Sequence, residues 1–136
     1  MDNEYKILIR LSSDDYDFCN DIENYKNYEI KTIKKGENLR LNSSFIARAN
    51  ILIIEHIYEK QISEININDN YDKLINLFKL IENKYINNKI KKEFYLSCSI
   101  NNDQFGFEIN EKLISLLSNY GFSLSVSGIA YLWWMW

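Results

Sequence analysis

Apolar residues alternate with polar ones in two stretches of the chain, and each stretch predicts a strand. Residues 4–11 place Tyr, Ile, Ile and Leu on one face, and residues 122–127 alternate Phe, Leu and Val with three serines. Successive side chains of a strand point to opposite faces, so each pattern predicts one buried face and one face in water. By the same reasoning we expect strands at residues 28–34 and 93–100. The run Ile-Leu-Ile-Ile at residues 51–54 is apolar on both faces and indicates a central strand.

Helical spacing of apolar residues predicts two further elements. The longer helix begins near Asn70, carries apolar residues at helical spacing as far as Tyr85 and ends before Asn88. The second helix has Asn110 as its N-cap and an apolar stripe of leucines. It ends at Gly121, where we expect a glycine in the left-handed conformation.

A third, short helix is expected between the first two strands. Ser12 or Ser13 supplies its cap, and Asp14 and Asp15 then lie favourably near its positive end. This helix runs to about Tyr25. The sequence Lys-Gly-Glu at residues 35–37 predicts a turn, whereas residues 38–49 fit either a further short strand or a loop.

These elements follow the order β-α-β-β-α-β-α-β and predict an α+β fold. We expect a mainly antiparallel twisted sheet of about five strands, with two to three helices packed on one face. The length of 136 residues fits a single α+β domain, residues 1–136. A hydrophobic content of 46% is enough for a core, so disorder is not expected.

Net charge and hydropathy narrow the classes of partner. A net charge of −3 argues against a general nucleic-acid binder, which needs a basic stripe to displace counterions. The first residues do not have the pattern of a signal peptide, and no apolar run approaches the roughly 20 residues that span a bilayer. We therefore expect a cytoplasmic protein with neither a membrane nor a nucleic acid as its partner.

Residues that could carry catalysis are few. His56 is the only histidine, which excludes a site with two histidine ligands, and Cys19 and Cys98 have no closely spaced partner cysteine. Both cysteines fit buried free thiols. The sequence Lys-Lys-Gly-Glu-Asn at residues 34–38 lacks the glycines of a phosphate loop, and residues 66–72 lack the glycine and final Glu of a calcium loop. We expect a protein that is not an enzyme and has no catalytic residue, metal or cofactor.

An acidic segment is the first candidate for binding a partner. Residues 12–24 hold five carboxylates and no Lys or Arg, and lysines and arginines gather in the region that follows. The pattern fits a solvated helix surface, or a surface that masks a basic partner protein such as a toxin domain. The candidate partner-binding residues here are Asp14, Asp15, Asp17, Asp21 and Glu23.

The end of the chain is the second candidate, because the sequence closes with Tyr-Leu-Trp-Trp-Met-Trp. Trp133, Trp134 and Trp136 cannot all face inward from one extended strand, since neighbouring residues alternate faces. Either this aromatic tail folds back over the wet face of the sheet, or it contacts another chain. A homodimer through the aromatic tail is one form of the second alternative.

Two segments resemble a known bacterial family. Residues 93–131 show a strand, a Gly-Phe turn, a helix with Leu-Leu, a glycine and an alternating strand that ends in tyrosine, and residues 34–37 read Lys-Lys-Gly-Glu. In these features the chain resembles the bacterial domain of unknown function 4279 family. The resemblance implies a compact α+β bacterial domain and brings no established catalytic residues.

Together these observations favour a binding function. The main hypothesis is an immunity or antitoxin protein that neutralises a cognate bacterial toxin by binding it. Such a protein needs only a stable scaffold and a charged, shape-complementary surface. The alternative is a homo-oligomeric or small-ligand-sensing bacterial domain.

Overall fold

The computed structural model describes residues 3–38, 45–60, 64–66, 71–100, 106–108 and 111–130. Five strands form one sheet in the order β2-β3-β1-β5-β7. Their bounds are Asn3–Ser13 (β1), Glu29–Ile33 (β2), Asn50–Lys60 (β3), Lys91–Ile100 (β5) and Phe122–Ala130 (β7). All neighbouring pairs are antiparallel except β5 and β7, which are parallel. The sheet is therefore mixed but mainly antiparallel, as the sequence predicts.

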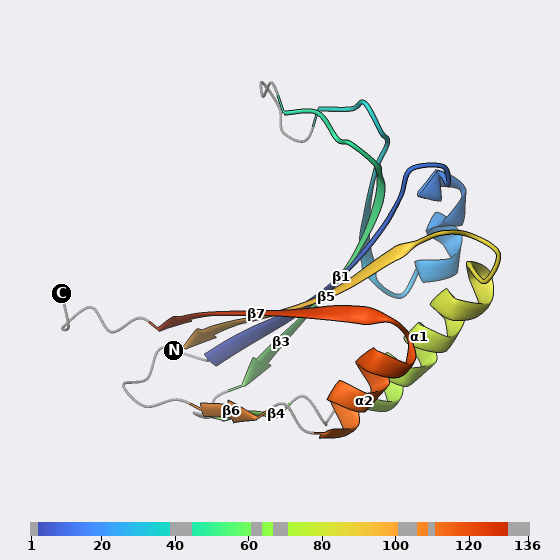
Figure 1. Cartoon of the computed structure of the whole chain (residues 1–136). Coiled ribbons are helices and arrows are strands. Elements are labelled where there is room, and N and C mark those ends of the chain that lie inside the picture. The colour runs from blue at the N-terminus through green and yellow to red at the C-terminus, as the bar shows by residue number, and fades with distance from the viewer. Residues whose placement is uncertain are drawn as a thin grey trace.

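Three helices in the described part of the chain complete the α+β fold and lie on one side of the sheet (Figure 1). They are η1, a 3₁₀ helix at Phe18–Tyr25, and the α-helices α1 at Tyr71–Lys84 and α2 at Glu111–Asn119. Their buried side chains belong to one core cluster with those of the sheet. The other side of the sheet, which we call the open face, carries none of these three helices.

The alternation along β1 sets which residues enter the core. Ile7, Ile9 and Leu11 are at most 2% exposed, and the residues between them point to the open face. In the registers of the central strand, Ile9 lies opposite Ile54 of β3 and Phe94 of β5. The apolar row therefore continues across three strands, as the pattern predicts.

Helix α1 covers this row with an aromatic contact at its centre. Phe78 is fully buried and stacks on Phe122 with ring centroids 4.3 Å apart, while its edge-to-face contact with Phe94 spans 6.2 Å. Aromatic pairs in these geometries contribute about 0.5–1.5 kcal/mol beyond their buried area. They join α1 to the parallel pair of β5 and β7.

The two predicted glycine turns are confirmed. Gly121 follows α2 with φ of 73°, and Gly36 stands in the turn after β2 with φ of 91°. Both values lie in the left-handed region, which only glycine enters without steric cost. Gly121 thereby reverses the chain from α2 into the parallel strand β7.

The predicted start of the first helix is wrong. β1 continues to Ser13, and the Ser13 hydroxyl oxygen accepts hydrogen bonds from the backbone N–H groups of Asp15 and Tyr16 at 3.3 and 3.1 Å. Ser13 thus closes a turn, and the helix cap is Asp17, whose carboxylate accepts a bond from the Cys19 N–H at 3.0 Å. The helix begins four residues later than a cap at Ser13 implies, and it is a 3₁₀ helix.

Three further features differ from the pattern-based expectation. Strand β3 runs to Lys60, well beyond residues 51–54. The ambiguous region 38–49 contains an antiparallel bridge between Asn38 and Ile46, and residues 39–44 lie outside the described part. Two short strands, β4 at Glu64–Asn66 and β6 at Gly106–Glu108, pair in parallel as a separate sheet.

The inward-facing prediction for β7 holds for its first residue only. Phe122 is buried, but Leu124 and Val126 are 37% and 44% exposed. They lie beside Phe94 and Leu96 in the parallel register, yet β7 is the outermost strand of its sheet. An edge strand has a neighbour on one side only, so its side chains keep more contact with water.

Candidate protein-docking surface

The open face of the sheet carries a network of charged side chains centred on Glu93. Arg10 lies opposite Glu93 in the register of β1 and β5, with its Nε 3.9 Å from the carboxylate, and the Lys91 Nζ is also 3.9 Å away. The Tyr95 hydroxyl donates a hydrogen bond to the same carboxylate. That bond, with smaller contributions from burial and charge, raises the pKa of Tyr95. Glu93 is therefore engaged by several groups of its own chain.

A hollow of about 630 Å³ lies beside this network, and we call it the open-face groove. Figure 1 shows the connection between β2 and β3 projecting away from the helices, and residues 45–49 of this connection border the groove. The remaining lining comes from β1, β3 and β5. The lining residues are Arg10, Ser12, Phe45, Ile46, Ala47, Arg48, Ala49, Ile51, Lys91 and Glu93.

The groove combines a buried apolar base with exposed apolar side chains. Ala47 and Ile51 are 3% and 4% exposed, whereas Phe45 is 71% and Ile46 is 54% exposed. A bridge and two backbone hydrogen bonds hold this connection in place: Gly36 N–H to the Ala47 carbonyl at 2.9 Å, and Ala47 N–H to the Glu37 carbonyl at 2.8 Å. The exposed side chains of Phe45 and Ile46 thus extend from a segment whose backbone is held by hydrogen bonds.

A second hollow of about 490 Å³ shares four lining residues with the open-face groove: Ser12, Arg48, Ala49 and Lys91. Its lining also includes Lys89 and two acidic residues, Asp14 and Asp15; we call this acidic pair the acidic rim. Neither Arg48 nor Lys89 forms an ion pair with the residues that the structure describes. Two cations without an ion-pair partner among the described residues therefore line the same hollow as the acidic rim.

The structure separates the five predicted acidic residues. Asp14 and Asp15 are exposed and form the acidic rim, and Glu23 is exposed on η1. Asp17 caps η1 and lies 3.6 Å from the Lys34 Nζ. The hydrogen bond from the Cys19 backbone is the main cause of a lowered pKa at Asp17. A single acidic surface does not form.

Asp21 is the clearest correction, because the prediction that it lies on an exposed acidic helix is wrong. It is only 4% exposed. Its Oδ2 accepts hydrogen bonds from the hydroxyls of Tyr16 at 2.7 Å and Tyr85 at 2.9 Å, and its Oδ1 is 3.3 Å from the Lys84 Nζ. Tyr25 donates to the Tyr85 hydroxyl at 2.9 Å. Asp21 therefore connects η1 to the end of α1 inside the protein.

The tyrosines around Asp21 stay protonated over a wide pH range. Burial is the main cause of a pKa of about 12 at both Tyr16 and Tyr25. Burial and the hydrogen bond with Tyr25 raise the pKa of Tyr85 still further. Each tyrosine therefore keeps a hydroxyl proton that it can donate in a hydrogen bond. We call Asp21, its three tyrosines and Lys84 the Asp21 cluster; its contacts connect η1 to α1.

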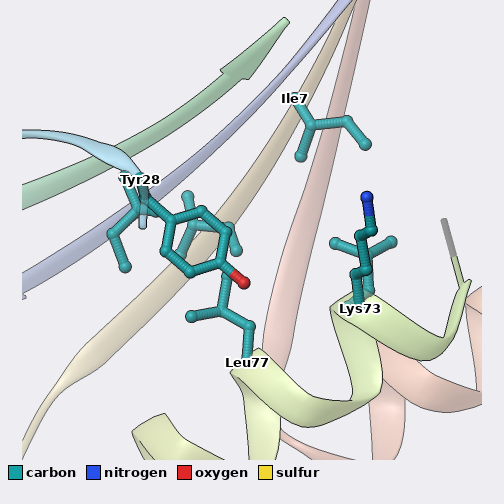
Figure 2. Close-up of a pocket in the computed structure, with 7 residues that line it drawn as sticks. Ile7, Tyr28, Lys73 and Leu77 are labelled. Carbon is teal, nitrogen blue, oxygen red and sulfur yellow. The ribbon is translucent and has the colours of Figure 1, made fainter. Parts of the chain in front are cut away.

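A narrow crevice lies on the helix side of the sheet, between β1, β3 and α1. Its volume is about 20 Å³, close to that of a single water molecule, and its lining is mostly apolar: Ile7, Ile9, Tyr28, Ile54, Lys73, Leu74 and Leu77. Figure 2 shows the Tyr28 hydroxyl and the Lys73 amine extending beside this space from opposite sides. The crevice is too small for an organic ligand.

Several predicted residues lie where no side chain is described. Trp133, Trp134 and Trp136 fall outside the described residues, and so do the side chains of His56 and Cys98. Cys19 is a free, half-buried thiol with its Sγ 3.7 Å from the Thr32 hydroxyl. Among the residues that the structure describes, no group of three or more His, Cys, Asp or Glu side chains is placed to hold a metal ion.

The sequence pattern does not identify the residues of the open-face groove. Arg10 and Glu93 stand at polar positions of two predicted strands, but only the pairing of β1 with β5 brings them together. Phe45 and Arg48 lie in the region whose structure the pattern left open. The polar and apolar residues of this region do not follow the period of a strand or a helix, so the pattern does not predict which side chains share a surface.

Comparisons with protein-family models, with curated proteins and with solved structures find no match for this chain. The resemblance to the domain of unknown function 4279 family therefore stays a prediction. In the described part of the chain, none of the helices has both the length and the apolar character needed to cross a membrane.

Proposed function

We propose that this chain is a non-catalytic protein-binding module of the immunity or antitoxin type, which acts in the bacterial cytoplasm on a cognate toxin. The open-face groove is its docking surface. The observation that carries the proposal is the joint exposure of Phe45 and Ile46 beside Arg48, which has no ion-pair partner among the described residues.

The composition of the groove fits protein recognition. Protein interfaces are enriched in aromatic residues and arginine, and a few such residues carry most of the binding energy. An exposed Phe contributes when a partner removes it from water, at about 25 cal/mol per Å² of apolar surface. Burial of Phe45 and Ile46 by a partner is therefore favourable, because both lie largely in water in the free protein.

The charges of the groove describe the surface that would complement it. A carboxylate on the partner would complement Arg48 and Lys89, and a basic side chain beside it would complement the acidic rim. A basic toxin domain would contact the acidic rim, as the sequence hypothesis supposes for Asp14 and Asp15. The proposal replaces the single acidic helix surface with a mixed-charge surface that includes both signs.

A charge-reversal series tests this proposal. We expect Arg48→Glu to slow association with the toxin domain encoded beside this gene by about tenfold at low salt, with a smaller effect at high salt. Phe45→Ser should instead accelerate dissociation, because it removes apolar contact area rather than steering charge. Stopped-flow fluorescence with a labelled toxin domain measures both rates.

The matched control is Lys79→Glu, which makes the same charge change at an exposed position of α1 on the helix side. It should leave both rates unchanged. If Arg48→Glu and Phe45→Ser both associate and dissociate at the rates of the unmodified protein, the open-face groove is not the docking surface.

A further inference from the structure

The outer edge of β7 has the properties of a strand that pairs with another strand. Among the described residues β7 pairs with β5 alone and forms one end of the five-stranded sheet. Figure 1 shows β7 as the long red strand on the near side of the sheet. Its nine residues, Phe-Ser-Leu-Ser-Val-Ser-Gly-Ile-Ala, include no charged residue and no proline. A free edge of this kind exposes a row of backbone donors and acceptors.

The opposite edge of the same sheet is protected in the usual way. β2 is five residues long and carries Glu29 and Lys31, both exposed. Short length and charged side chains are the common devices that prevent pairing between sheet edges. The two edges of one sheet are therefore unlike, and only β7 lacks these devices.

The sequence of β7 is self-complementary about Ser125. Antiparallel pairing of two copies around this residue places Leu124 opposite Val126, Ser123 opposite Ser127 and Phe122 opposite Gly128. Apolar residues then face apolar residues, serine faces serine, and the largest side chain faces the residue without one. Cross-strand pairs of matched character each contribute about 0.2–1 kcal/mol.

The exposure of the side chains agrees with this arrangement. Leu124 and Val126 are 37% and 44% exposed in the single chain, although the alternation predicts buried positions for both. A second β7 would supply the missing neighbour on their outer side. Leu124 and Val126, which the fold leaves partly in water, are thus the apolar pair that a symmetric pairing brings together.

We propose that two copies of this chain associate through antiparallel pairing of their β7 strands, with the two-fold axis at Ser125. The partner is a second copy, because the sequence of the edge complements itself. Paired residues of antiparallel strands share a face, so the two five-stranded sheets form one continuous sheet. Both open-face grooves then lie on the same side of the dimer and can engage two partner molecules.

Charge substitution at the axis tests both the dimer and its register. Sedimentation velocity from micromolar to submillimolar concentration should show the unmodified protein shifting from 16.3 kDa towards twice that mass. Ser125 lies opposite itself, so Ser125→Lys and Ser125→Glu each place like charges together. Each should weaken self-association by about tenfold or more at low salt.

Mixing these two variants provides the decisive comparison. The mixture should form a heterodimer that is more stable than either homodimer, because lysine then faces glutamate, and native mass spectrometry resolves the three species. Lys31→Glu at the other edge is the matched control and should dimerise as the unmodified protein does. Far-UV circular dichroism confirms that each variant is folded.

Two results would overturn the proposal. One is an unmodified protein that stays monomeric over the whole concentration range. The other is a dimer that both Ser125 variants form as readily as the unmodified protein, which would place the contact elsewhere, for example at the aromatic tail.

Discussion

The Asp21 cluster makes the sharpest prediction about stability. Asp21→Ala removes the acceptor of two hydrogen bonds, from Tyr16 at 2.7 Å and from Tyr85 at 2.9 Å, and the ion-pair partner of Lys84 at 3.3 Å. The Tyr85 hydroxyl is left in a buried site with Tyr25 as its remaining neighbour. Lys84 keeps access to water, because its side chain is 25% exposed.

The magnitude follows from the hydrogen bonds. Each bond to a charged acceptor contributes about 1.5–3 kcal/mol, and loss of one member of a buried charged pair costs about 3–5 kcal/mol. We expect Asp21→Ala to lower the free energy of unfolding by about 3–5 kcal/mol, a large part of the 5–15 kcal/mol of an average domain. Asp21→Asn keeps the shape and one acceptor oxygen, so its loss should be smaller, about 1–3 kcal/mol.

Urea unfolding followed by far-UV circular dichroism measures these losses. The matched control is Glu23→Ala, which removes an exposed carboxylate from the same helix and should change the free energy by no more than about 0.5 kcal/mol. If Asp21→Ala unfolds at the same urea concentration as Glu23→Ala, Asp21 does not connect η1 to α1, and it contributes no more to stability than an exposed carboxylate does.

Two further predictions concern pH and backbone conformation. Burial raises the pKa of Tyr25 to about 12 in the folded protein, against about 10 when unfolded, so the folded state holds this proton more tightly. The contribution of Tyr25 to the free energy of unfolding should therefore be fully present below pH 10. It should fall as the pH rises towards 12, by up to about 1.4 kcal/mol per pH unit. Urea unfolding measured at each pH should show a flatter slope for Tyr25→Phe. Gly121→Ala should lower the free energy of unfolding by about 1–2 kcal/mol, because φ of 73° strains a residue with a Cβ. Its added Cβ meets only the Lys92 side chain at 3.8 Å, so Asn119→Ala, at an ordinary helical position, should lose much less stability in the same measurement.

The elements that the sequence predicts best are those with long periodic patterns. The alternation in β1 and the helical spacing in α1 recur over several turns or pairs, and burial of Ile9 and Phe78 follows directly from them. The short strands β4 and β6 have three residues each, which is too few for a period to emerge. The predicted start of η1 is wrong because a serine hydroxyl can close a turn as readily as it caps a helix, and Ser13 closes a turn.

The candidate site was harder to predict because its contacts join distant parts of the chain. Asp21 lies 64 residues before Tyr85, so nothing in the local pattern of residues 12–24 distinguishes this carboxylate from its exposed neighbours. A charged residue is normally expected in water, and its burial depends on partners that only the fold supplies. The open-face groove likewise exists because residues 45–49 lie beside β1 and β5, an arrangement that the spacing of Phe45 and Arg48 does not encode.

The central claim is that the partner docks in the open-face groove, and hydrogen–deuterium exchange on the complex with the toxin domain tests it most directly. The account predicts slower exchange at residues 45–51 and 91–95 when the toxin domain binds, with no change in α1 or α2. Slower exchange confined to α1 and α2, with residues 45–51 exchanging as in the free protein, would contradict it.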